Sequence, residues 1–296
     1  MADYQWYPGH MTKAHRMMKE SIRSVDMVVE LVDARIPLAS RNPDIEALAG
    51  NKKRLLVLNK EDLADPARTK AWLQYFRDRG EYAIPFNAKK NSGGEKVTDA
   101  MRKLLADRTR RDREKGIRPV VSAMIAGIPN VGKSALINCL AKRALTKTAN
   151  RPGVTRGKQW ISLAGDVRLL DTPGILWPKF EDQTVGMRLA VIGSMNDVNL
   201  DLQTLALGLV RALCGDYNGI IENAYGFTAE EVRNLAEEER LTGGDAAVIG
   251  MVAKKRGCVM RGGVPDYDKA SAVLLTDFRN GRLGRLTLEM PETAGE

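Results

Sequence analysis

The sequence has few cysteines and no long hydrophobic segment. Its three cysteines, Cys139, Cys214 and Cys258, lie far apart and match neither a zinc-binding spacing nor a disulfide framework. An odd number of isolated cysteines is typical of a protein from a reducing cytosol, and we expect all three to be buried as small apolar side chains. No apolar run approaches the roughly 18 residues that a membrane-spanning helix requires, so we expect no membrane partner.

The N-terminus also lacks the features of a targeting signal. Residues 1–7 contain no basic segment followed by an apolar stretch, so no secretory signal is expected. They also differ from the arginine-rich and serine-rich start of an organellar transit peptide. We therefore expect a cytoplasmic protein.

The formal net charge of +9 is spread unevenly along the chain. Residues 1–179 contain 34 lysines and arginines against 19 acidic residues, whereas residues 180–296 contain 12 against 18. Residues 254–285 are basic again, with 8 basic against 3 acidic residues. A basic surface of this size favours a polyanionic partner such as nucleic acid, although the charge alone leaves open a surface that is merely well solvated.

Short apolar runs alternate with helical patterns over the first part of the chain. This alternation is typical of parallel β-α-β units with right-handed crossovers, and it predicts an open α/β sheet with helices on both faces. The expected strands are 26–33, 54–59, 82–87, 120–126, 158–164 and 166–171, and the expected helices are 66–79, 94–115 and 133–142.

Helix-forming residues dominate from about residue 181. Thr228 and Glu231 have the spacing of a capping box, which predicts a helix that begins there. We therefore expect a second, small, all-helical domain and divide the chain into a sheet domain of residues 1–178 and a helical domain of residues 179–296. The expected helices are 202–213, 229–240, 245–255 and 268–279.

Residues 127–134 form a glycine-rich loop that follows an expected strand and precedes an expected helix. They match the Walker A pattern, in which the glycines let backbone N–H groups surround a phosphate. Lys133 would place its charge on the β- and γ-phosphates and assist catalysis, and the Ser134 hydroxyl would bind Mg²⁺. The residues expected to contact the nucleotide here are Asn130, Val131, Gly132, Lys133, Ser134 and Ala135.

Two further segments have the form of phosphate-sensing switches. Residues 171–174 end an expected strand, so Asp171 would hold Mg²⁺ and the Gly174 amide would contact the γ-phosphate. Thr155 lies in an expected loop between Ser134 and Asp171, which makes it the expected second hydroxyl ligand of Mg²⁺.

A candidate guanine-reading element lies upstream of the phosphate loop. Asp62 can accept hydrogen bonds from N1–H and the 2-amino group of guanine, a pair that adenine does not offer. The Lys60 stem would lie along the base, and Asn59 would brace the phosphate loop from behind. The loop Asn87-Ala88-Lys89 follows the next strand, and its Ala88 amide would contact guanine O6.

These motifs resemble those of the TRAFAC-class GTPases, and their order matches the circularly permuted branch, because the base-reading residues precede the phosphate loop. Residues 6–11 and 33–43 look like the YlqF/RbgA family of bacterial ribosome biogenesis GTPases, and the resemblance covers essentially the whole chain. Other permuted ribosome-assembly GTPases carry an OB-fold or a cysteine-rich zinc site, which this sequence lacks.

The resemblance implies a GTP-hydrolysing factor for late maturation of the large (50S) ribosomal subunit. Such a factor would bind the rRNA and ribosomal proteins of the subunit precursor in its GTP state and leave after hydrolysis. Separately from the resemblance, we expect a monomer. The rRNA contacts would come from the basic sheet domain and the helical domain. Two alternatives stay open: an RNA-binding scaffold that uses GTP as a structural ligand, and a GTPase of another RNA-processing assembly.

The sequence lacks the glutamine that orients the attacking water in many GTPases. Many GTPases place a glutamine after the switch glycine, but Ile175 and Leu176 stand there and neither can hydrogen-bond water. The resemblance implicates His10, although His10 could instead pack locally or contact rRNA, and His15 is expected to contact RNA or solvent. The resemblance also suggests that Asn130 helps to bind K⁺, with a loop-stabilising role as the alternative.

Overall fold

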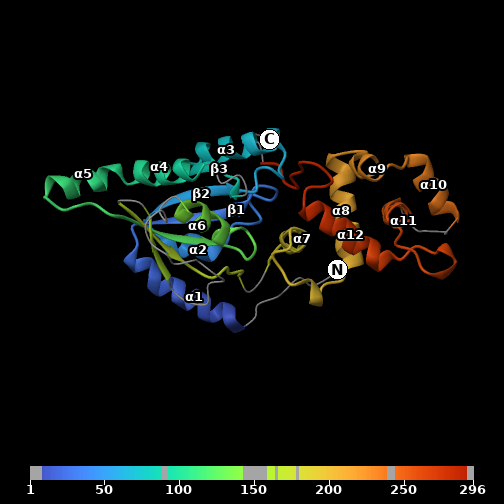
Figure 1. The fold of residues 1–296 in the computed structure, drawn as a ribbon, viewed down its shortest axis with the longest axis horizontal. Coiled ribbons are helices and arrows are strands. Elements are labelled where there is room, and N and C mark those ends of the chain that lie inside the picture. The colour runs from blue at the N-terminus through green and yellow to red at the C-terminus, as the bar shows by residue number, and fades with distance from the viewer. Residues whose placement is uncertain are drawn as a thin grey trace. The chain divides into compact units, whose positions relative to one another are not determined.

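The computed structural model describes residues 9–88, 93–142, 159–163, 166–177, 180–238 and 244–291, and it forms two compact units (Figure 1). One unit contains the sheet and comprises the described residues up to 177 together with residues 289–291; the other comprises residues 180–288. The sequence analysis placed everything beyond residue 178 in the helical domain. Residues 289–291 instead pack with the sheet unit.

The sheet has six strands in the order β3-β2-β1-β4-β6-β5. All neighbouring pairs are parallel except β5 and β6, which are antiparallel. The predicted α/β class with a parallel-rich sheet is thereby confirmed. The strands are β1 (Met27–Asp33), β2 (Lys53–Asn59), β3 (Tyr82–Pro85), β4 (Val121–Gly127), β5 (Gln159–Ser162) and β6 (Val167–Asp171).

Six helices accompany the described part of the sheet unit. Where one helix was predicted over 94–115, the structure has two, because the backbone of the buried Leu105 leaves the helical conformation between them. The first two helices were not predicted, although Asn42 followed by proline is a helix-start signal and its side chain does cap the Asp44 N–H. They are α1 (Gly9–Ser21), α2 (Pro43–Ala49), α3 (Pro66–Asp78), α4 (Gly94–Leu104), α5 (Ala106–Glu114) and α6 (Lys133–Lys142), with the 3₁₀ turn η1 (Ile22–Ser24) after α1.

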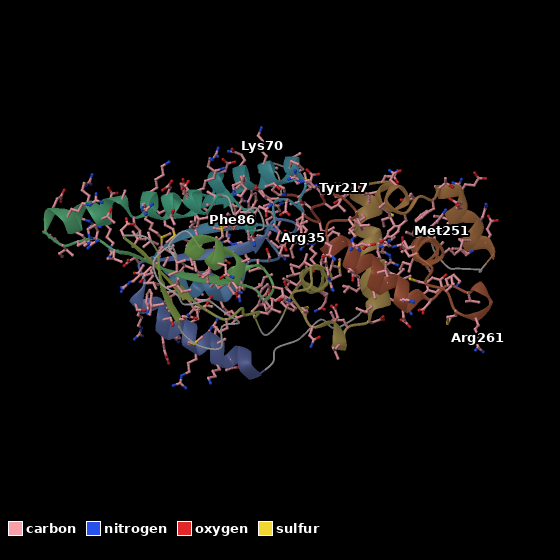
Figure 2. All side chains as sticks on the ribbon, viewed as in Figure 1. Arg35, Lys70, Phe86, Tyr217, Met251 and Arg261 are labelled. Carbon is pink, nitrogen blue, oxygen red and sulfur yellow. The ribbon has the colours of Figure 1, made fainter. Side chains whose placement is uncertain are left out.

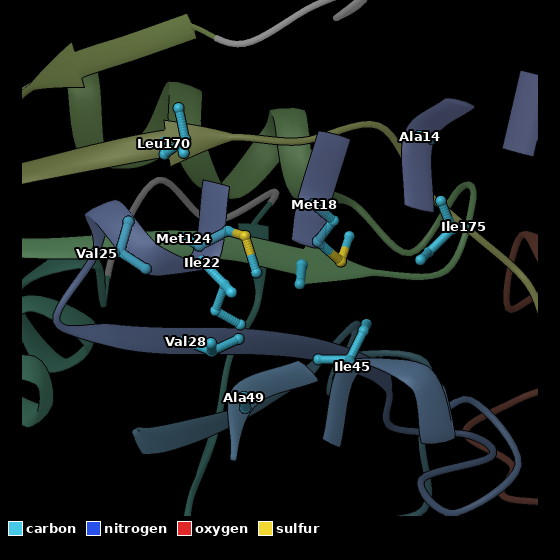
Figure 3. Close-up of a cluster of buried hydrophobic side chains, with 11 residues drawn as sticks. Ala14, Met18, Ile22, Val25, Val28, Ile45, Ala49, Met124, Leu170 and Ile175 are labelled. Atoms are coloured by element: carbon cyan, nitrogen blue, oxygen red, sulfur yellow. The ribbon is translucent and has the colours of Figure 1, made fainter. Parts of the chain in front are cut away.

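The sheet is buried on both faces. On one face, Val28 of β1 aligns with Met124 of β4 in an apolar cluster that includes residues of α1 and α2 (Figure 3). On the same face, Val32 and Leu58 pack in a second cluster with Trp72 and Phe76 of α3. The residues that alternate with these along the strands are also fully buried, as a parallel sheet between helical layers requires: Leu31, Val57 and Ile125.

The helical unit is built around α11, whose residues 247–253 are all buried, including Met251 (Figure 2). Gly250 permits this packing, because a Cβ atom there would lie 2.8 Å from Leu235 Cδ2. The predicted capping box is present: the Thr228 N–H donates to Glu231 Oε2 (2.6 Å) and the Glu231 N–H to Thr228 Oγ1 (3.2 Å). The described helices are α7 (Gln183–Val191), α8 (Leu202–Asp216), α9 (Ile220–Tyr225), α10 (Ala229–Glu238), α11 (Gly244–Lys255) and α12 (Tyr267–Arg279), with 3₁₀ turns η3 (Asp197–Asn199) and η4 (Arg261–Gly263).

The cysteines and the hydrophobic segments only partly follow expectation. Cys139 and Cys258 are buried, but Cys214 on α8 is half-buried, so the expectation was wrong for that residue. Within the described ranges, none of the helices combines the length and the hydropathy that crossing a bilayer would need.

Candidate functional site

The carboxyl ends of the parallel strands bring the separated motifs to one edge of the sheet. Asp33 at the end of β1 is aligned with Asn59 at the end of β2, and Asp171 at the end of β6 is aligned with Ile125 of β4. β4 itself ends at Gly127, where the glycine-rich loop begins. Ligands of open α/β sheets bind at this edge, so the two groups of motifs meet where a nucleotide is expected.

The glycine-rich loop needs glycine at both of its ends. Gly127 has φ +148°, and a Cβ atom there would lie 2.5 Å from the carbonyl oxygen of Leu31. Gly132 has φ +103°, and a Cβ atom there would collide with Nδ2 of Asn59. The loop leads directly into α6, which begins at Lys133, so the N–H groups of its first turn are available to an anion.

Asn59 ties the base-reading strand to the phosphate loop. Its buried side chain donates a hydrogen bond from Nδ2 to the Val131 carbonyl (2.7 Å) and accepts one at Oδ1 from the Ala88 N–H (3.3 Å). One amide therefore joins three of the predicted motifs. Asn87, the preceding residue, is buried as well.

The lysine of the base-reading element is held by a buried charge network. Lys60 has a left-handed backbone (φ +62°), and its Nζ lies 2.9 Å from Oδ2 of Asp33. Arg35 binds the same carboxylate in a bidentate manner, at 2.9 Å and 2.8 Å. Burial acts to raise the pKa of Asp33, but the charges of Arg35 and Lys60 outweigh this effect and hold that pKa well below its usual range.

Asp33 and Arg35 support the site but were assigned no role from the sequence. The signal that could have identified them is an acidic residue at the end of a buried strand with a basic residue two positions later. Asp62, in contrast, is half-buried and forms no hydrogen bond or ion pair with another described residue.

Lys133 is a buried cation inside the loop. Its Nζ donates to the carbonyls of Gly127 (3.1 Å) and Ile128 (2.7 Å). Burial lowers the pKa of its ammonium group to about 8, an effect that the charge of Asp171 opposes. The hydrogen-bond partners of this buried ammonium group are neutral carbonyls, so a bound anion would stabilise its charge. The loop therefore fits a phosphate.

The second switch packs directly on the phosphate loop. Thr172 Oγ1 donates to the Ile125 carbonyl (2.6 Å), which fixes the chain just after Asp171. A Cβ atom on Gly174 would lie 2.6 Å from Lys133 Nζ and 2.8 Å from Pro129 Cα. Only glycine therefore permits this close approach. The exposed Ser134 hydroxyl and the buried Asp171 carboxylate are oxygen donors of the kind that Mg²⁺ prefers.

Several predicted site residues can be placed only in part. Thr155 and Lys89 lie outside the described residues, and His10 is in the first turn of α1 but its side chain is not described. Asn130 is exposed with a left-handed backbone (φ +56°), and Ala135 is exposed in the first turn of α6. The His15 imidazole lies 3.7 Å from the Asp44 carboxylate of α2 and stays partly exposed, so the expected contact with RNA or solvent stays a prediction.

Comparisons with known proteins agree with this geometry. Residues 122–211 match the family model described as a 50S ribosome-binding GTPase. The chain is 46% identical to the ribosome biogenesis GTPase A of Bacillus cereus, over 99% of this chain and 95% of the relative. It is 32% identical to the protein of the same name from Thermotoga maritima (97% and 94% covered) and to mitochondrial ribosome-associated GTPase 1 of Mus musculus (96% and 90% covered).

Solved structures give the same result. The fold is similar to GDP-bound YlqF, with a TM-score of 0.64 and 28% identity over 93% of this chain and 99% of that one. It is equally similar to GNP-bound YlqF from T. maritima, with a TM-score of 0.64 and 29% identity over 95% of this chain and 99% of that one.

Proposed function

Because the chain belongs to the ribosome biogenesis GTPase A family, we propose that it hydrolyses GTP while bound to the precursor of the large ribosomal subunit, late in maturation. It is a GTPase of ribosomal subunit assembly. The observation that carries the proposal is the Asn59–Val131 hydrogen bond, since it holds a base-reading element and a phosphate loop together as one nucleotide site.

Each part of GTP has a matching group. Asp62 would accept the two guanine N–H donors, with the Lys60 stem along the base and the Ala88 amide at O6. Backbone N–H groups of the loop and Lys133 would surround the phosphates. Bound Mg²⁺ would neutralise charge on the β- and γ-phosphates, with Ser134, Thr155 and Asp171 as its protein ligands.

Hydrolysis would depend on a group outside the switch. Ile175 and Leu176 are fully buried and apolar, so neither can orient the attacking water. We assign that role to His10, at the start of α1, because a near-neutral imidazole can position water or accept its proton. K⁺ held by Asn130 would add positive charge beside the phosphates.

Helix α5 is the surface of the sheet unit best suited to rRNA. It contains no buried residue and extends beyond the sheet in Figure 1. Residues 102–118, which include α5 and its flanking residues, carry 8 basic against 3 acidic residues. Exposed cations are found in α5 and on both of its flanks: Lys103, Arg113, Lys115 and Arg118. In the helical unit, the exposed residues Lys254 and Arg261 offer a second basic surface. Arg261 is labelled in Figure 2. Phosphate backbones bind such clusters.

Sedimentation with immature and mature large subunits tests the proposal. The protein should pellet with immature subunits in the presence of a non-hydrolysable GTP analogue and stay in the supernatant with GDP. Lys133→Ala should abolish this dependence on nucleotide, whereas Lys70→Ala, at an exposed position of α3, should behave as the wild type (Figure 2). If the protein pellets equally with the GTP analogue and with GDP, the result would favour an RNA-binding scaffold instead. A monomeric state and a cytoplasmic location stay predictions.

A further inference from the structure

Ile175 connects the second switch to the N-terminal helix. Its side chain is fully buried and belongs to the apolar cluster that contains Ala14 and Met18 of α1 (Figure 3). It stands where many GTPases carry a water-orienting glutamine. The position is therefore used for packing rather than for contact with water.

The backbone of Ile175 is fixed to the nucleotide site. Its N–H donates to the Gly127 carbonyl (3.3 Å), the first residue of the phosphate loop. Its carbonyl accepts a hydrogen bond from Asn42 Nδ2 (3.1 Å). The preceding Gly174 packs directly on the phosphate loop, since a Cβ atom there would lie 2.8 Å from Pro129 Cα. A change in the phosphate loop or the switch must therefore reach Ile175.

Helix α1 rests on the sheet unit along a narrow stripe. Among its described side chains, the buried apolar ones are Ala14 and Met18, one helical turn apart. His10 lies one turn before Ala14. Ala14 and Met18 share their cluster with Ile175, so a shift of Ile175 leaves a void unless α1 follows it.

We propose that Ile175 is a positioning residue that couples the state of the switch to α1 and thereby sets the placement of His10. The inference rests on the catalytic role proposed for His10. In this proposal, Ile175 replaces the usual glutamine by a packing residue. It fixes the position of α1, the helix that carries His10.

Hydrogen exchange of the α1 amides tests the coupling directly. In the wild type, amides 13–21 should exchange more slowly with a non-hydrolysable GTP analogue than with GDP. Ile175→Ala should abolish that difference and lower subunit-stimulated kcat by about 10-fold to 100-fold, the scale of a misplaced catalytic group, with GTP affinity within about twofold. Ile175→Val is a smaller change and should reduce both the nucleotide-dependent difference in exchange and the kcat, to a lesser extent. This variant serves as the test if Ile175→Ala fails to fold.

The matched control is Ile45→Ala. Ile45 is equally buried in the same cluster but belongs to α2. This variant should keep both the nucleotide-dependent exchange of α1 and the turnover. If Ile45→Ala abolishes the difference as fully as Ile175→Ala does, the cluster acts as a general core and the proposal is overturned.

A double variant separates this proposal from the role of His10. If Ile175 acts through His10, then His10→Ala and the double variant with Ile175→Ala should have the same reduced kcat. If His10→Ala turns over normally, the catalytic assignment fails, while the exchange experiment still decides the coupling. Nucleotide-dependent exchange that persists in Ile175→Ala would overturn the inference.

Discussion

Glu289 Oε1 accepts a hydrogen bond from the Ala39 N–H at 3.0 Å, although the two residues are 250 positions apart in the sequence. Its Oε2 accepts a second one from the Leu38 N–H at 2.8 Å, and its backbone carbonyl accepts one from Trp72 Nε1 at 3.2 Å. The chain thus leaves the sheet unit after the second switch and returns to the loop that follows Asp33.

Removal of this carboxylate should destabilise the sheet unit. Glu289→Ala leaves the N–H groups of Leu38 and Ala39 without their acceptor, so we expect a loss of about 1–3 kcal/mol in the free energy of unfolding. Denaturant unfolding measures it. Met290→Ala, at the exposed neighbouring position, is the control and should be nearly neutral. Equal midpoints for the two variants would show that the Glu289 contacts contribute nothing measurable.

A side chain at Gly132 should disable the nucleotide site without unfolding the protein. The added Cβ atom collides with Asn59 in a left-handed backbone, which breaks the contact between the phosphate loop and the base-reading strand. We expect Gly132→Ala to weaken GTP binding by at least about tenfold in a fluorescent-nucleotide titration. Gly215→Ala is matched to it, because that helical glycine has open space around it, and it should bind GTP normally.

The stability of the protein should fall between about pH 4.5 and pH 7 because of Glu30. Burial raises the pKa of this carboxyl from 4.5 to about 7, although the charge of Arg41 opposes the shift. The folded state therefore binds the proton more tightly than the unfolded state. That stabilisation, at most about 3 kcal/mol, is complete below pH 4.5 and is lost as the pH rises through 7.

Glu30→Gln isolates this effect, since the amide is neutral at every pH and can still accept from the Asn42 N–H. The difference in unfolding free energy between wild type and variant should change across the window from pH 4.5 to pH 7. Glu114→Gln removes an exposed carboxylate that does not act on Glu30 and should leave the pH profile intact. Parallel profiles for wild type and Glu30→Gln would contradict the prediction.

Neutralising the cations at the end of α5 and just after it (the α5 variant) should weaken subunit binding and its dependence on salt. Arg113, Lys115 and Arg118 are exposed. If each contacts a phosphate, replacing all three with glutamine should reduce the slope of log K against log salt by about 2–3. A triple variant with the same charge change, Lys70→Gln, Lys96→Gln and Arg233→Gln, should keep the wild-type slope. An unchanged slope in the α5 variant would remove this surface from the binding site.

Potassium should accelerate turnover through Asn130. Replacing KCl with NaCl at constant ionic strength should slow GTP hydrolysis if the amide helps to hold K⁺. Asn130→Gly tests the alternative, because glycine tolerates the left-handed backbone but lacks the amide. We expect this variant to lose the potassium response. Retained stimulation would mean that Asn130 only shapes the loop.

Local patterns were sufficient for much of the fold. The strand ending at Asn59 and the helix beginning at Lys133 could be read from apolar runs and glycine positions, and the capping box at Thr228 formed as predicted. Four helices were not predicted: α1, α2, α7 and α9. Two of them, α2 and α9, are short, with 7 and 6 residues. Helices of that length are marginal by themselves and depend on tertiary packing, which a window of sequence does not contain.

The sequence by itself determined the residue types of the candidate site, because the phosphate loop and the proposed guanine-reading element are each encoded in consecutive residues. Only the tertiary structure decided which distant groups support them. The bond from Asn59 to Val131, the ion pair of Lys60 with Asp33, and the burial of Ile175 against α1 all join segments separated along the chain. Their physical basis is the register of parallel strands and the packing of side chains across the sheet, which exist only once the chain has folded.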